Sequence, residues 1–157
     1  MELSFVNCFW LMFPILIWNI IFYKKLPQKE FRNNKKLSRT VVYLESFLRY
    51  IVFSIPLVLP IKFDALYLEL GLLIYLIGLV LYFFTWIPLL FFSESKLSKS
   101  PIILMLPFAS PIFPFIGIAL ISHSLIYGLI SFVFISVHLY NGLLLFDLLD
   151  HKEKAKV

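Results

Sequence analysis

The run from residue 65 to residue 92 constrains this sequence most, because it holds 28 residues and one charged side chain, Glu69. About 20 consecutive apolar residues suffice for a helix to cross the hydrocarbon core of a bilayer. Similar apolar runs lie at residues 3–23, 41–61, 101–121 and 125–146. Because backbone in lipid must satisfy its hydrogen bonds internally, the sequence predicts an all-α integral membrane protein, a single domain of five transmembrane helices.

Composition supports this class. The chain is 61% hydrophobic, with a mean hydropathy of +0.94, against roughly 45–50% apolar residues in soluble domains. The first run does not resemble a secretory signal peptide, because Glu2 is the only charge before it, it is too long, and no small-residue cleavage site follows. We therefore expect residues 3–23 to form the first membrane helix.

Positive charge orients the predicted spans. Seven Lys and Arg residues lie in the loop 24–39, two in 93–100 and three in the tail 147–157, whereas the two remaining loops hold only Lys62. Cytoplasmic segments retain Lys and Arg. Five spans place all three basic segments on one side, which predicts a cytoplasmic carboxyl terminus and an external amino terminus, in a cell or plasma membrane.

A four-span alternative remains, in which residues 101–121 are re-entrant. It satisfies the charge rule if residues 122–124 stay cytoplasmic and residues 125–146 do not cross fully. The length and apolar composition of residues 125–146 favour five spans.

The predicted fourth span carries Pro107, Pro111 and Pro114. Each proline removes a donor and leaves a carbonyl without its helical partner. In a membrane such backbone is tolerated where it is buried in protein or lines a wet cavity, helped by hydroxyl side chains. We expect a kinked or broken helix packed inside the bundle, with Ser110 as the one hydroxyl of residues 105–117 that could help form a ligand site.

Ionisable residues inside spans mark candidate sites, because burying charge in lipid is costly. Glu45 and Arg49 stand at i and i+4, which favours an ion pair on one helix face. Two interpretations are open. The pair could lock the second span in place, or Arg49 could recognise an anionic headgroup or substrate with Glu45 as its orienting group or base.

His138 and Asn141 stand at i and i+3 on the last predicted helix, so both can face one neighbour. Structural hydrogen bonding is the simpler interpretation, and proton transfer the alternative. The sequence has no HxxxH, HExxH or CxxC pattern and no phosphate-binding glycine loop, so it predicts neither a metal site nor a bound cofactor.

Two packing predictions concern other helices. Gly71 and Gly78 are seven residues apart, which allows close helix approach on one face. In the first span, polar and aromatic residues follow helical spacing, and we expect this stripe to face the bundle: Asn7, Trp10, Pro14 and Trp18.

The basic residues flank membrane segments, which argues against a nucleic-acid partner. Because no catalytic pattern stands out, the sequence favours a non-enzymatic accessory protein or a bundle that binds lipid or a small ligand. An enzyme acting on a lipid, using Glu45, Arg49 and His138, is the alternative. A subunit of an oligomeric transporter or channel is a third. The expected partners are membrane lipids and either another membrane protein or further copies of the chain.

Overall fold

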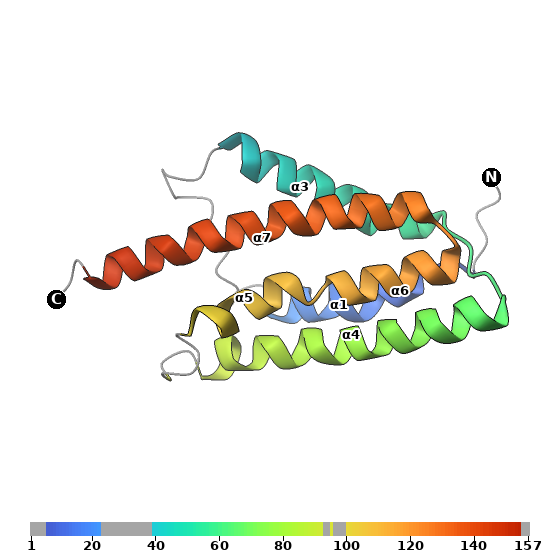
Figure 1. Cartoon of the computed structure of the whole chain (residues 1–157), viewed down its shortest axis with the longest axis horizontal. Helices are drawn as coiled ribbons and strands as arrows, with labels where there is room; N and C mark the ends of the chain where they lie inside the picture. Colours follow the sequence, from blue (N-terminus) through green and yellow to red (C-terminus); the bar gives the residue numbers. More distant parts are fainter. Residues whose placement is uncertain (1–5, 23–38, 93–94, 96–99, 155–157) are drawn as a thin grey trace.

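The computed structural model describes residues 6–22, 39–92, 95 and 100–154. Within these residues the regular elements are all helices, which confirms the predicted all-α class. They are α1 (Phe9–Phe22), α3 (Arg39–Ser54), the short 3-10 helix η1 (Ile55–Leu57), α4 (Ala65–Phe91), α5 (Pro101–Ala109), α6 (Ile112–Ser122) and α7 (Leu125–Lys154). They form an elongated bundle in which the start of α1 and the end of α7 lie at opposite ends (Figure 1).

Four helical stretches are long and apolar enough to cross a membrane: Arg39–Leu57, Ala65–Phe91, Pro101–Ile121 and Leu125–Leu144. The fifth candidate, α1, has 14 residues, which is about 21 Å of helix against roughly 30 Å of hydrocarbon. Residues 3–5 and 23 of the predicted first span lie outside the described residues. Most of the basic loop 24–39 lies there too.

Two boundaries differ from the sequence prediction. The second span was expected to reach residue 61, but its helix ends with η1 at Leu57, and the chain beyond it pairs with the start of α1 through a hydrogen bond from the Cys8 amide to the Leu59 carbonyl (2.9 Å). The last helix does not stop at residue 146 but continues through most of the predicted tail to Lys154. The four-residue extension of backbone after Leu57 therefore anchors the first helix.

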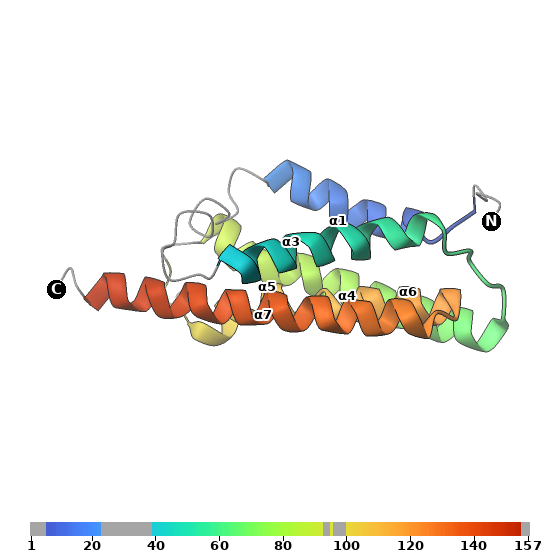
Figure 2. The same ribbon diagram turned by 90° about the horizontal axis from the view of Figure 1, so that it is seen from above.

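The helices close into a ring. The helix α3 packs against α7, α7 against α5 and α6, and α6 against α4. Two tyrosine hydroxyls of α4 complete the ring by donating to α1, from Tyr75 to the Leu11 carbonyl (2.6 Å) and from Tyr82 to Asn19 Oδ1 (2.8 Å). Seen from above, α1 and α7 lie on opposite sides of the bundle (Figure 2).

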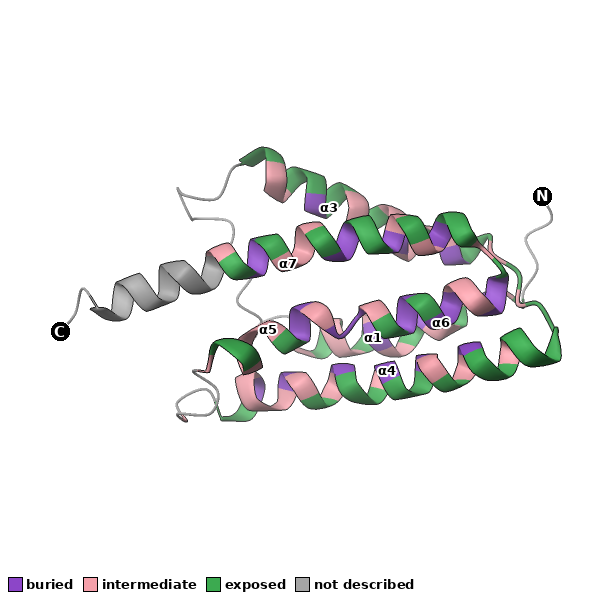
Figure 3. Ribbon diagram, in the orientation of Figure 1, coloured by how far each residue is buried: buried purple, intermediate pink, exposed green. Residues whose placement is uncertain are grey.

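One stripe of α4 faces the interior (Figure 3). Its buried members are spaced by three or four residues: Gly71, Tyr75, Gly78, Tyr82, Trp86 and Leu90. The two glycines let α6 approach closely, because a methyl group on Gly71 would lie 3.0 Å from the Gly117 carbonyl oxygen. The predicted close packing at Gly71 and Gly78 is confirmed.

The prediction for the stripe on α1 is wrong in part. Trp10 is 50% exposed, whereas Cys8, Met12 and Ile15 are buried. The pairing of Cys8 with Leu59 turns this apolar face inward. Asn7, which precedes α1, donates from Nδ2 to the Leu57 carbonyl (3.0 Å) instead of joining the stripe.

We predict that Gly78→Ala destabilises the bundle. The added methyl would lie 2.5 Å from Cβ of Phe113 and 2.5 Å from Cδ of Pro114. Overpacking destabilises a protein by about 1–3 kcal/mol. The higher helix propensity of alanine stabilises it by about 1 kcal/mol at most, which is less. Gly128→Ala is the matched control, because its methyl would meet only Ala119 Cβ at an ordinary 3.5 Å. Unfolding in detergent measures both, and equal stability of the two variants would contradict the packing.

Candidate functional site

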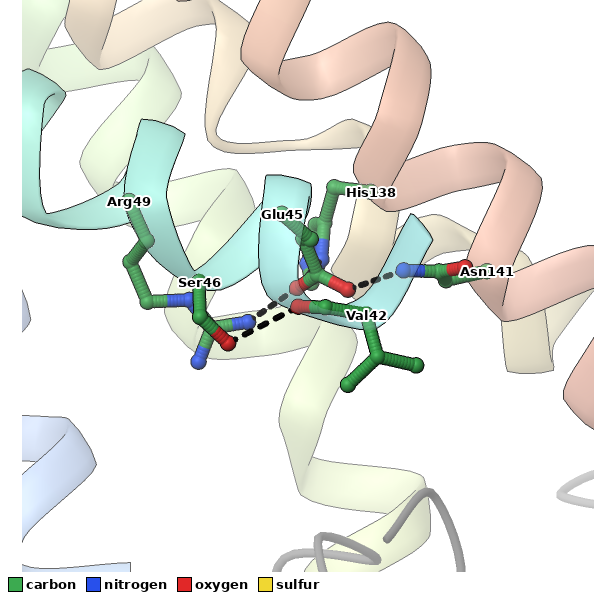
Figure 4. Close-up of polar contacts among 6 residues, drawn as sticks. All are labelled: Val42, Glu45, Ser46, Arg49, His138 and Asn141. Atoms are coloured by element: carbon green, nitrogen blue, oxygen red, sulfur yellow. Dashed lines mark hydrogen bonds and ion pairs between the residues drawn. The ribbon is translucent and has the colours of Figure 1, made fainter. Parts of the chain in front are cut away.

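A buried carboxylate lies between α3 and α7. Glu45, on the inner face of α3, is 6% exposed. A carboxylate removed from water needs hydrogen-bond donors at both oxygens. The helix α7 supplies them one turn apart, at His138 and Asn141 (Figure 4).

The two carboxylate oxygens have different donors. Oε1 accepts from His138 Nδ1 (2.9 Å) and also from Nη2 of Arg49, one helical turn further along α3. Oε2 accepts from Nδ2 of Asn141, which is fully buried. An ionised carboxylate can only accept, so Nδ1 of His138 carries the hydrogen in this pair. The structure therefore brings together four of the five predicted site residues.

Aromatic rings hold the imidazole of His138 in place. Phe134, one turn earlier on α7, stacks on it with ring centres 5.4 Å apart and planes 13° apart. Phe108 of α5 lies against it at 4.9 Å. The side chain of His138 remains 15% exposed. The ring position is thus set by one hydrogen bond and two ring contacts.

Arg49 differs from its partners in exposure, because 44% of its side chain is exposed. Within the described residues it donates only to Glu45. A guanidinium has five N–H donors, so most of its hydrogen-bonding capacity is available to another group. Phe53, one turn beyond Arg49, packs against the cluster that includes Ile15 and Tyr82. Arg49 therefore occupies the flank of α3 that faces α1 and α4.

Ser110 is not part of this cluster. It is buried between α5 and α6, and its hydroxyl lies 3.3 Å from Thr85 Oγ1 of α4. Thr85 also donates to the Tyr82 carbonyl (2.9 Å). The serine thus belongs to a small hydroxyl contact between α4 and the proline-rich segment, separate from the Glu45 carboxylate.

Several residues that contact the candidate site residues were not predicted from the sequence. Phe134 could have been found, because it lies one turn before His138 on the same face. Phe108 and Thr85 come from other helices, and no spacing within one segment points to them. Asn19 of α1 accepts from the buried Tyr82 hydroxyl of α4, and no spacing within one segment points to that contact either.

The arrangement can do two things chemically. The buried carboxylate neutralises and orients a half-exposed guanidinium, which is the group of choice for phosphate and carboxylate ligands. It also fixes the tautomer of His138 so that Nε2 is the basic nitrogen. Within the described residues, no group of three or more His, Cys, Asp or Glu side chains is placed to hold a metal ion.

Known proteins add no further information on the site. No protein-family model, no curated protein and no solved structure matches the chain.

We predict that Glu45→Ala destabilises the contact between α3 and α7. The change leaves three donors without their acceptor, and those of His138 and Asn141 are buried; an unsatisfied buried donor typically costs about 1–3 kcal/mol. Glu69→Ala is the control, because Glu69 is an exposed acid near the start of α4, and such changes stay within about 0.5 kcal/mol. Unfolding by SDS titration compares the two. A Glu45→Ala protein as stable as the control would show that the cluster does not hold the helices together.

Proposed function

We propose that the chain is a five-span membrane protein without enzymatic activity that binds an anionic lipid headgroup through Arg49. The half-exposed guanidinium, held on one side by the buried Glu45, is the observation that carries the proposal. The accessory role expected from the sequence is compatible with such binding.

The five-span topology rests on several supports. The chain enters α1 and leaves α7 at opposite ends of the bundle (Figure 1). Residues 3–23 are apolar over a length sufficient to cross, although the described helix covers only Phe9–Phe22. We place the amino terminus outside and the carboxyl terminus in the cytoplasm, on the distribution of Lys and Arg.

We also propose that the fourth span bends at Ser110 and Pro111. These two residues separate α5 from α6. Pro111 and Pro114 cannot donate to the carbonyls four residues earlier, and the Phe113 amide donates instead to the Ser110 carbonyl at 3.3 Å, a three-residue step.

The position of Arg49 favours a headgroup as ligand. Its side chain bonds Glu45, one turn nearer the start of α3, so it runs back toward the end of the bundle where the basic segments are attached. If the cytoplasmic boundary lies near Val41, helix rise places the backbone of Arg49 about 12 Å deep. Long cationic side chains return their charge toward the headgroups from such depths. Glu45 occupies one side of the guanidinium, and an anionic headgroup would accept from the N–H groups that remain exposed.

The backbones of α1 and α3 diverge along the bundle. In Figures 1 and 2 they converge near η1 and separate toward the end where α3 begins. Arg49 lies on the flank of α3 that faces this separation, as its neighbour Phe53 indicates.

The Glu45–His138 pair favours a second candidate, an enzyme that acts on a lipid. A carboxylate bound to Nδ1 leaves Nε2 as an oriented base, as in many general-base pairs. Within the described residues His138 makes no other hydrogen bond, so the proton to be removed would come from the substrate or water.

The topology gives a prediction that can be tested in sealed membranes. With Cys8 replaced by alanine, Lys62→Cys and Lys152→Cys are each labelled by a membrane-impermeant maleimide. Five spans place the two positions on opposite sides, with position 62 outside. Labelling of both from the same side would contradict the five-span arrangement.

The ligand prediction concerns Arg49→Ala. One charge-assisted hydrogen bond is worth about 1.5–3 kcal/mol, so affinity for an anionic phospholipid should fall about tenfold to hundredfold. Native mass spectrometry of protein exchanged into detergent with defined lipids measures the loss. Arg49→Lys, which keeps the charge beside Glu45, should lose less.

Arg39→Ala is the matched control for this experiment, because Arg39 is an exposed arginine at the start of the same helix. Equal losses in Arg39→Ala and Arg49→Ala would indicate general attraction to positive charge and would reject the site. Unchanged lipid in Arg49→Ala would reject it as well. Recovery of chemically altered lipid from the unmodified protein would favour the enzyme instead.

A further inference from the structure

The carboxamide of Asn19 on α1 is oriented by one hydrogen bond. The buried Tyr82 hydroxyl of α4 donates to Asn19 Oδ1 (2.8 Å). Because a primary amide has one acceptor oxygen and two N–H donors, this bond occupies the oxygen and leaves both N–H groups of Nδ2 for other partners. Asn19 is half-buried, and within the described residues its Nδ2 has no hydrogen-bond partner. The amide is therefore a positioned donor that the fold itself does not use.

Asn19 and Arg49 lie at the same level of the bundle. The helices α1 and α3 run in opposite directions along it (Figure 2). Ile15 of α1 belongs to the cluster against which Phe53 of α3 packs. One helical turn toward the end where α3 begins leads from Ile15 to Asn19 on one helix, and from Phe53 to Arg49 on the other. The free amide and the half-exposed guanidinium thus occupy equivalent positions on the two helices.

The Tyr82 hydroxyl is the common neighbour of these groups. It bonds Asn19 directly, and the positive charge of Arg49 acts on it, so the guanidinium lies on the side of α3 toward α4. Trp86 packs against Tyr82 with ring centres 6.4 Å apart, and its buried Nε1 donates to no acceptor in the described part of the chain. The side chains around this hydroxyl therefore have an excess of hydrogen-bond donors, which an acceptor-rich anion would balance.

We propose that Asn19 is the second donor of the Arg49 headgroup site and binds the same lipid phosphate, with Tyr82 as the residue that positions its amide. This inference rests on the proposed function, since it adds a group to that site. Phosphate oxygens accept several hydrogen bonds, and the guanidinium and the amide Nδ2 offer them donors alone. A phosphate bound to both side chains connects α1 to α3 at the level where their backbones diverge.

The same contacts specify the class of headgroup. The acidic side chain beside Arg49 is Glu45, and donors from α3 and α7 already occupy both of its oxygens. An ammonium group carried next to the phosphate, as in phosphatidylethanolamine, would therefore find no free carboxylate at Glu45. We expect the site to prefer a phosphodiester headgroup without an ammonium group, such as that of phosphatidylglycerol.

Native mass spectrometry of the full chain in detergent with phosphatidylglycerol tests the second donor. Asn19→Ala should lower the affinity about tenfold, the effect of losing one hydrogen bond to a charged group. Asn19→Asp keeps the acceptor for Tyr82 but replaces the donor with a negative charge, so it should bind less lipid than Asn19→Ala. Asn7→Ala is the control, because it removes a carboxamide that attaches the other end of α1 to the Leu57 carbonyl. It should leave the affinity unchanged.

The role of Tyr82 is tested by comparing two hydroxyls of α4 that both donate to α1, those of Tyr82 and Tyr75. Tyr82→Phe should lower the affinity about threefold, because the amide of Asn19 is then free to rotate. Tyr75→Phe should have no effect on it. In an Asn19→Ala background Tyr82→Phe should cause no further loss, whereas a residue that merely supports the fold would add its own.

The outcomes separate this inference from the proposed function. Unchanged lipid binding in Arg49→Ala would overturn both. Loss of lipid in Arg49→Ala with full binding in Asn19→Ala, or an equal loss in Asn7→Ala and Asn19→Ala, would overturn the second donor alone. Stronger binding by Asn19→Asp than by Asn19→Ala would show that the residue supports the fold through Tyr82 instead of contacting the phosphate. Displacement of the lipid by excess inorganic phosphate would overturn a lipid as the source of the anion.

Discussion

The convergence of three donors on the Glu45 carboxylate is the interaction on which the position of α3 depends. Lipid provides no hydrophobic force to drive helices together, so packing and interhelical hydrogen bonds must do so. The helix α3 buries few residues, with Glu45 and Val52 as its buried members. The bonds from His138 and Asn141 therefore contribute an unusually large share of what holds α3 against α7.

The opposite half of the bundle is held in another way. The helices α4 and α6 meet through glycines, where the backbone of one lies against the backbone or side chains of the other. Such contacts gain dispersion energy over a long surface and need no polar groups. The helix α7 contacts both halves, α6 through packing and α3 through the carboxylate. The helices α4 and α6 thus form a closely packed pair, whereas α3 is held in place by polar contacts with α7.

The sequence predicts the helices well, because long apolar runs leave few alternatives in lipid. It also indicates the members of the polar cluster, since Glu45 with Arg49 and His138 with Asn141 each share a helix face. It does not predict that the two pairs meet, because that depends on which face of α3 docks on α7. The prediction that Trp10 faces the bundle is wrong for a similar reason, since a backbone hydrogen bond at Cys8 fixes the rotation of α1 about its axis. The Ser110 hydroxyl contacts Thr85 of α4, and the spacing of residues within the proline-rich segment does not indicate this partner.

The faces of α3 explain why a membrane helix can be so polar. Glu45 and Arg49 are one turn apart and lie on neighbouring parts of one face, whereas Tyr50 directly follows Arg49 and points about 100° away from it, to the outside of the bundle. The fold provides Glu45 with donors from α7 and provides Arg49 with the Glu45 carboxylate, whereas the Tyr50 hydroxyl has no hydrogen-bond partner within the described residues. The charged residues of α3 are accounted for by its inward side, where the Glu45 carboxylate accepts from Arg49, His138 and Asn141.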